Sequence, residues 1–116
     1  MAEVNGKIKW PMGLPDVKTF APAAAVTLVC ENMLNFFNAS AAMAANMTVN
    51  FAIDGQLELG ARAVVRAASD GTARSVTPTG TAIGTAQAGV ISKTFVYEFE
   101  LSPGNQWVLT SARQID

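Results

Sequence analysis

Residues 90–101 read Val-Ile-Ser-Lys-Thr-Phe-Val-Tyr-Glu-Phe-Glu-Leu, residues 102–105 read Ser-Pro-Gly-Asn, and residues 106–115 read Gln-Trp-Val-Leu-Thr-Ser-Ala-Arg-Gln-Ile. Alternation with a period of two predicts a strand with one inner face. That face carries Ile91, Lys93, Phe95, Tyr97, Phe99 and Leu101. Pro103 suits the second position of a turn, and Gly104 accepts the positive φ of the third. The stretch therefore predicts a β-hairpin, and its four aromatic residues, of nine in the chain, predict the densest part of the core.

A second alternating run precedes this hairpin. In residues 47–53, Met, Val, Phe and Ile alternate with Thr, Asn and Ala, and Asp54-Gly55 follows. Asp-Gly is a strong signal for a two-residue hairpin turn, so residues 57–65 are expected to return as the paired strand. An Ala-rich helix over residues 57–68 is the alternative, and Gly60 favours the strand.

Residues 22–45 show a helical period instead. Thr27, Glu31, Asn35 and Asn38 are spaced four, four and three apart, which places them on one stripe of a helix. Pro22 stands where proline is favoured, in the first turn. The sequence predicts one main helix here that packs on a sheet through its apolar face, with a strand over residues 25–30 as the competing interpretation.

Two segments rich in proline or glycine are expected to lie outside the regular core of the domain. Residues 1–20 contain two prolines, Pro11 and Pro15, which disfavour a helix and predict an extended N-terminal arm. Residues 74–89 consist largely of Thr, Ala and Gly around Pro78, so they are expected at a sheet edge or in a loop. We therefore expect an arm over residues 1–20 and a single α+β domain over residues 21–116, in which the N-terminal helix packs on a curved antiparallel sheet of about four to five strands.

The closing hairpin also suggests a fold analogy. Phe-Val-Tyr-Glu-Phe-Glu-Leu at residues 95–101, followed by the Pro-Gly-Asn turn and Gln-Trp-Val-Leu at residues 106–109, resembles the end of a cystatin-like cone of the nuclear-transport-factor type. The resemblance implies a helix lying across a strongly curved sheet whose concave face can hold a ligand. It covers about the last third of the chain and implies no particular activity.

Composition narrows the classes of function. The chain of 116 residues has no histidine, which removes the commonest general base at neutral pH and the commonest metal ligand. Its formal net charge is −1 and its basic residues are scattered, so nucleic acid is not expected as a main partner. The single cysteine, Cys30, is expected to be a small buried side chain in a reducing compartment. The most apolar stretch is interrupted by polar residues, so no membrane span is expected. The N-terminus lacks an export pattern, which predicts folding in the cytoplasm.

Few side chains suggest chemistry. Glu98 and Glu100 share a strand face, and the simplest interpretation is that they pair with Arg62, Arg66 or Arg113 on a solvated surface. Tyr97 is expected to reach the rim of the sheet with its hydroxyl, next to a solvated Lys93. We expect no catalytic residue, no cofactor and no metal site.

The leading hypothesis is a non-catalytic structural or assembly protein that acts as an oligomer, with copies of itself or other structural proteins as partners. An Ala-, Thr- and Gly-rich chain with an extended arm is typical of virion components of tailed bacteriophages, such as decoration, connector or tail proteins. The candidate interface comprises Val4, Ile8, Trp10, Leu14, Val76, Thr79, Thr81 and Ile83.

Two alternatives remain open. The first is a small-ligand binder or enzyme with a cystatin-like cone fold, whose pocket on the concave sheet face comprises Phe95, Tyr97, Phe99 and Trp107. The second is an interaction domain of a secretion system.

Overall fold

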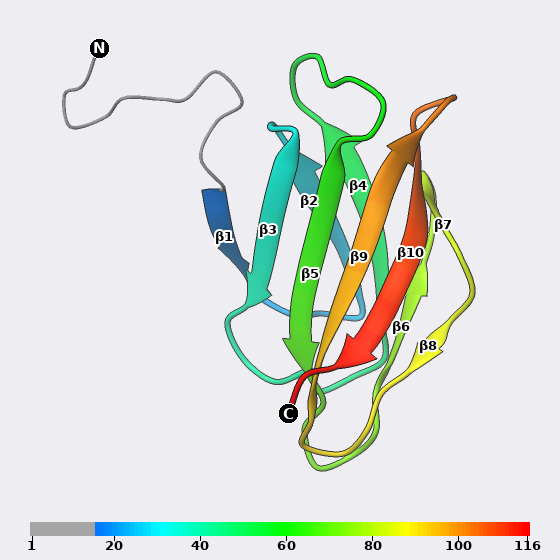
Figure 1. Cartoon of the computed structure of the whole chain (residues 1–116). Coiled ribbons are helices and arrows are strands. Elements are labelled where there is room, and N and C mark those ends of the chain that lie inside the picture. The colour runs from blue at the N-terminus through cyan, green and yellow to red at the C-terminus, as the bar shows by residue number, and fades with distance from the viewer. Residues whose placement is uncertain (1–15) are drawn as a thin grey trace, which may run out of the picture.

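The computed structural model describes residues 16–116, and every regular element in that part of the chain is a β-strand (Figure 1). The strands are β1 (Asp16–Phe20), β2 (Ala25–Cys30), β3 (Leu34–Ala39), β4 (Met47–Ile53), β5 (Arg62–Ala68), β6 (Ser75–Pro78), β7 (Ala82–Ile83), β8 (Gln87–Ala88), β9 (Thr94–Ser102) and β10 (Gln106–Gln114). The expected α+β class is therefore wrong, and so is the cystatin-like cone, because residues 16–116 contain no helix that could lie across either sheet.

The strands form two sheets, and the chain alternates between them. One sheet, which we call sheet A, has the order β1-β3-β5-β9-β10-β7, and the other, sheet B, has the order β2-β4-β6-β8. From β1 to β9 successive strands lie in opposite sheets. Up to β6, strands two apart in sequence are therefore neighbours that run the same way, as β1, β3 and β5 do in sheet A and β2, β4 and β6 in sheet B. A parallel pair needs a long crossover connection. Here a strand of the other sheet supplies it.

The core lies between the two sheets and is centred on Phe51 of β4. Its ring lies 4.8 Å from that of Phe99 and 5.4 Å from that of Trp107, both in sheet A, and 6.3 Å from Phe37 of β3. All four side chains are at most 3% exposed. Aromatic contacts of this kind add to the stabilisation that burial of the rings provides.

The predicted helix over residues 22–45 is replaced by β2 and β3. Burial alternates with a period of two, because Leu28 and Cys30 point into the core while Val29 between them is exposed. The polar stripe at four-residue spacing is spread over two strands and the bend between them. Tertiary pairing outweighs helical periodicity here, since β2 gains a full parallel partner in β4. The competing interpretation, a strand over residues 25–30, is confirmed.

The closing hairpin is confirmed. β9 and β10 pair antiparallel around residues 103–105, with a positive φ at Gly104 (84°) and at Asn105 (58°). Of the predicted inner face, Tyr97, Phe99 and Leu101 are buried, and Trp107 joins them from β10. The register shifts after Leu109, which marks a β-bulge.

The predicted Asp54-Gly55 hairpin does not form. β4 belongs to sheet B and β5 to sheet A, so residues 54–61 carry the chain from one sheet to the other. The alternation in the returning run is nevertheless correct from Ala61 onward, since Ala61, Ala63 and Val65 are fully buried. The turn signal marked the end of β4 correctly but not the partner of the next strand.

Residues 74–89 form three short strands, β6, β7 and β8. β6 lies between β4 and β8, and its last residue, Pro78, stands opposite Val49. β7 and β8 form the far edges of sheets A and B. Among residues 16–116, no helix is long and apolar enough to cross a membrane.

Candidate interaction surface

The two sheets end on one side in full-length strands. β1 is the edge of sheet A and β2 the edge of sheet B. Ser40 donates its backbone N–H to the Phe20 carbonyl at 2.8 Å, so Phe20 and Lys18 direct their main-chain groups toward β3. In a strand the intervening residues point the other way. Val17 and Thr19 therefore direct their N–H and C=O groups to the open side, where no strand of the described chain pairs with them.

The opposite side is built differently. Its edges are β7 and β8, which have two residues each. Short strands offer little main chain for pairing, which is a common protection of sheet edges. The two lateral sides of the molecule are therefore unlike: the β1 side ends in edge strands of five and six residues, whereas on the other side β7 covers only Trp107 and Val108 of the longer β10.

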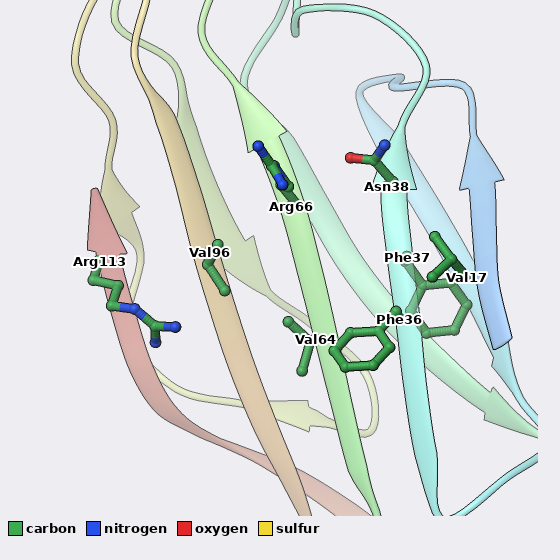
Figure 2. A pocket seen from close by; sticks show the side chains of 8 residues that line it. All are labelled: Val17, Phe36, Phe37, Asn38, Val64, Arg66, Val96 and Arg113. Carbon is green, nitrogen blue, oxygen red and sulfur yellow. The ribbon is translucent and has the colours of Figure 1, made fainter. Parts of the chain in front are cut away.

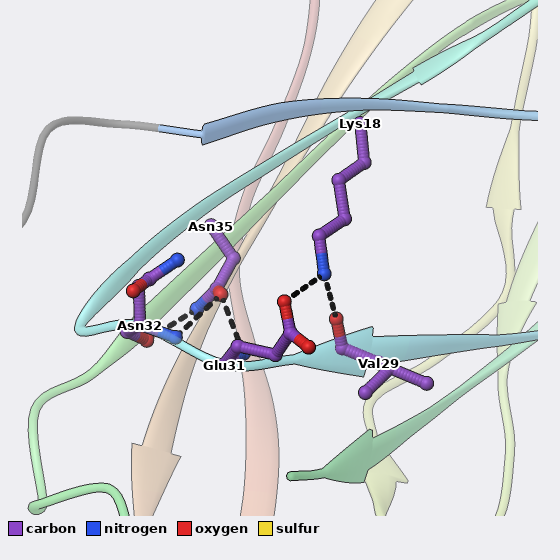
Figure 3. Close-up of polar contacts among 5 residues, drawn as sticks. All are labelled: Lys18, Val29, Glu31, Asn32 and Asn35. Carbon is purple, nitrogen blue, oxygen red and sulfur yellow. Dashed lines mark hydrogen bonds and ion pairs between the residues drawn. The ribbon is translucent and has the colours of Figure 1, made fainter. Parts of the chain in front are cut away.

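Lys18 links the two open edges (Figure 3). Its ammonium lies 2.6 Å from Oε1 of Glu31 and donates to the Val29 carbonyl of β2 at 3.4 Å. The Ala24 and Cys30 carbonyls face β4, where they accept from Thr48 and Asp54, so the Val29 carbonyl between them points to the open side. Lys18 thus occupies part of the β2 edge and leaves the edge of its own strand uncovered.

A buried asparagine holds the bend between β2 and β3 (Figure 3). Asn35, 3% exposed, accepts the backbone N–H groups of Glu31 and Asn32 at 3.0 Å each with its Oδ1. Its Nδ2 donates to the carbonyls of Asn32 at 2.6 Å and Arg62 at 3.0 Å. One side chain therefore replaces the main-chain pairing that this bend lacks, and it fixes the start of β3 against β5.

A groove crosses the outer face of sheet A next to the open edge (Figure 2). It has a volume of about 330 Å³. The lining residues are Val17, Phe36, Phe37, Asn38, Val64, Arg66, Val96 and Arg113. Strand register places Val17, Phe36 and Val64 in one row across β1, β3 and β5. The adjacent row contains Asn38, Arg66, Val96 and Arg113. The groove therefore has an apolar row beside a row with two guanidinium groups.

The arginines on this face of sheet A differ in whether they have an ion-pair partner. Glu98 pairs with Arg113 at 2.6 Å and with Arg62 at 3.8 Å, as expected from the sequence. Arg66 has no ion-pair partner among the described residues, although it is exposed in the same row as Arg113. The groove consequently keeps one guanidinium whose charge is not balanced within residues 16–116.

The structure separates the predicted interface residues. Val4, Ile8, Trp10 and Leu14 lie outside the described residues. Val76 is buried in the core, whereas Thr79 and Thr81 are exposed, and Ile83 is 40% exposed on β7. Thr81 uses its hydroxyl within the molecule, at 2.8 Å from the Phe51 carbonyl and 3.0 Å from Oδ1 of Asn50. These four residues lie on or beside the short edges rather than the open side.

The predicted pocket residues belong to the core. Tyr97, Phe99 and Trp107 are at most 1% exposed between the sheets, and half-buried Phe95 stacks on Tyr97 with ring centres 6.1 Å apart. The Tyr97 hydroxyl does not reach the rim, and it and Nε1 of Trp107 have no hydrogen-bond partner among the described residues. Burial raises the pKa of Tyr97 to about 12. A neutral, enclosed phenol is unsuited to exchange protons with a substrate.

Cys30 is fully buried, as predicted. Burial raises the pKa of its thiol to about 12, and the nearby Lys18 opposes the shift only in part. The thiol is therefore protonated at neutral pH and is a poor nucleophile or metal ligand. Within residues 16–116, no three His, Cys, Asp or Glu side chains come together in a group able to hold a metal ion.

Sequence reasoning did not identify the open side or the groove. Lys18, Val17 and Phe36 were assigned to an arm or to a helix, and only the pairing of β1 with β3 brings Val17 next to Phe36. Phe36 and Phe37 are both aromatic and show no alternation, and Val17 beside Lys18 is too short a run to reveal that the two segments are neighbours. No protein-family model matches the chain, and no curated protein matches it.

Proposed function

We propose that this protein is a non-catalytic assembly protein whose copies associate by main-chain pairing along β1. The observation that carries the proposal is the outward direction of the Val17 and Thr19 main-chain groups on a five-residue strand, beside a Val17 side chain that is 63% exposed. Unpaired edges with an apolar neighbour favour addition of another strand.

The titratable side chains of the described residues support a structural role over an enzymatic one. The buried phenol and thiol are held protonated, and the charged side chains Glu98, Arg62 and Arg113 neutralise one another on the surface of sheet A. A virion component of a tailed bacteriophage is one setting for such a protein, and that setting rests on composition alone.

An edge-blocking variant tests the proposal. In Thr19→Pro the outward N–H is removed while the bonds from β1 to β3 are kept, because proline is tolerated at an edge position whose N–H faces solvent. Thr19→Val is the matched control, since it retains the N–H and the β-branched shape. We expect light scattering after size-exclusion chromatography to show an oligomer for the natural chain and for Thr19→Val, and a smaller species for Thr19→Pro.

Two results would contradict the proposal. One is a natural chain that remains monomeric at every concentration measured. The other is a Thr19→Pro chain that is folded and has the same mass as the natural chain. Circular dichroism and the thermal midpoint establish that the variant is folded.

A further inference from the structure

The groove on sheet A faces outward, and the same molecule carries an exposed turn of matching chemistry. We propose that the turn at residues 58–61, with Glu58 and Leu59 at its exposed corner, docks into the groove of a second copy. The leucine would contact Phe36 and Val64, and the carboxylate would pair with Arg66. The inference rests on the proposed self-association and adds a second, different contact to it.

The turn is held in one conformation. Ala61 donates its N–H to the Glu58 carbonyl at 3.2 Å, and Gly60 donates to the Leu101 carbonyl at 2.9 Å. Gly60 has a φ of 91°, which a turn of this kind requires at its third position. Leu59 is consequently presented to solvent with 61% of its surface exposed, and Glu58 beside it is exposed as well. Little backbone conformational entropy is left to lose when such a turn binds.

The groove offers room and charge for this corner. An apolar cavity of ~150 Å³ is enough to bind benzene, whereas the groove has about 330 Å³. Figure 2 shows Phe36 and Val64 side by side on the sheet, with Arg66 near the end of β5. Arg66 has no acidic partner among residues 16–116, so a carboxylate brought by another copy meets an unbalanced guanidinium.

Charge selects this turn over the other exposed apolar turn. Val90 and Ile91 are 44% and 54% exposed at a turn in which Lys93 donates its N–H to the Val90 carbonyl. The exposed Lys93 side chain would bring a like charge toward Arg66 and Arg113, which is unfavourable. Glu58 brings the opposite charge. The turn at residues 90–93 therefore serves as an internal control of similar exposure.

The occupant must come from another copy. The turn precedes Arg62, the first residue of β5, whereas Arg66 lies roughly 13 Å further along the strand at the usual rise per residue. A rigid turn joined to the start of β5 cannot fold back over the middle of that strand. Because the turn and the groove are different patches, two copies can make the contact twice in a reciprocal twofold pair, or the contact can repeat from copy to copy and build a ring or a filament.

The test uses the Thr19→Pro chain, in which pairing along β1 is blocked. We expect it to keep a concentration-dependent association in analytical ultracentrifugation. Leu59→Ser and Arg66→Glu, each added to that chain, should weaken association by roughly ten-fold or more. Ile91→Ser should leave it unchanged. Combining Glu58→Lys with Arg66→Glu should restore it, because the charges are exchanged.

Mixing gives a second readout. The Leu59→Ser chain keeps an intact groove and the Arg66→Glu chain keeps an intact turn, so the mixture should form a one-to-one pair in native mass spectrometry while each variant alone stays monomeric. A Thr19→Pro chain that is monomeric throughout, or Leu59→Ser and Ile91→Ser with equal effects, would overturn the inference. Binding of dodecanoate in the groove of a Thr19→Pro chain that does not self-associate would also overturn the inference. Oligomers of the natural chain would in each case still support pairing along β1.

Discussion

The ammonium of Lys18 lies 2.6 Å from the carboxylate of Glu31 and thereby joins β1 of sheet A to the end of β2 in sheet B. The two residues are thirteen positions apart, and the bridge crosses the side on which both sheets end in full-length strands. It covers the outward Val29 carbonyl, so it blocks part of the β2 edge and leaves the β1 edge exposed.

Removal of this bridge should change association more than stability. Lys18→Ala exposes the Val29 carbonyl and breaks an ion pair whose side chains are 32% and 42% exposed, so a loss of about 0–1 kcal/mol in the free energy of unfolding is expected. Self-association should become stronger, because the Val29 carbonyl of the β2 edge is then free to pair. Urea denaturation and ultracentrifugation measure the two effects. Lys18→Arg, which keeps the charge, is the control, and a Lys18→Ala chain that associates less than the natural chain would refute the prediction.

Asn35→Ala should be strongly destabilising. The amide is 3% exposed and makes four hydrogen bonds to main-chain groups of Glu31, Asn32 and Arg62, which would lose their partner. A loss of about 2–4 kcal/mol in the free energy of unfolding is expected from stranded buried groups. The control is Asn38→Ala on the same strand, where the side chain is exposed and a change within about 0.5 kcal/mol is expected. Similar losses for the two variants would show that the Asn35 amide does not support the bend.

Tyr97→Phe should not destabilise the protein. The hydroxyl is buried without a hydrogen-bond partner among the described residues, so its removal abolishes a desolvation cost of about 1–3 kcal/mol and keeps the ring that stacks on Phe95. We expect a thermal midpoint equal to or above that of the natural chain. Phe99→Leu, at a position equally buried, should lower it by leaving a cavity. A clear loss of stability in Tyr97→Phe would show that the hydroxyl has a partner.

Alkaline pH should destabilise the fold through two buried weak acids, the Cys30 thiol and the Tyr97 phenol. Burial raises the pKa of Cys30 from 9.0 to about 12 and that of Tyr97 from 10.0 to about 12. Both groups therefore bind protons more tightly in the folded state, so their stabilising contribution is complete below about pH 9 and is lost as pH rises to about 12. In the double variant Cys30→Ala with Tyr97→Phe, the free energy of unfolding should fall less steeply between pH 9 and pH 12. Equal slopes for the natural chain and the double variant would contradict the assignment.

Two glycines with positive φ should respond differently to alanine. A Cβ on Gly80 (φ 64°) would lie 2.6 Å from Oδ1 of Asn50, which accepts the Thr81 N–H at 2.9 Å, whereas a Cβ on Gly55 (φ 95°) meets nothing within 4 Å. Gly55→Ala should cost about 1–2 kcal/mol from the backbone conformation alone. Gly80→Ala should cost more, because the amide of Asn50 must also move. Denaturant unfolding of the two variants gives the comparison, and a smaller loss for Gly80→Ala than for Gly55→Ala would contradict it.

Local signals predicted the parts of the fold that depend on short stretches of chain. Proline, glycine and asparagine at positions 103–105 set the turn between β9 and β10, and the alternation around Phe51 and Phe99 identified buried strand faces. The burial of Cys30 also followed from local pattern. These features need only neighbouring residues, so the sequence contains them directly.

Residues 22–45 show why the rest was not accessible. Their polar residues recur at helical spacing, yet β2 pairs with β4 and β3 with β1 and β5, across separations that no local period encodes. The groove is a consequence of the same pairing, because Val17, Phe36 and Val64 come from three strands. Their individual alternation indicates which side chains face outward but not which ones are adjacent.

By itself, the sequence determined the strand alternation of the second half of the chain, the closing turn and the apolar content of the core, because side-chain direction and turn conformation depend on residues close together. The tertiary structure decided that the chain alternates between two sheets, that β1 and β2 end one side of both, and that Arg66 lies beside an apolar row. Strand order and register depend on how two whole sheets bury a shared core, and that balance of long-range contacts is not written in any one segment.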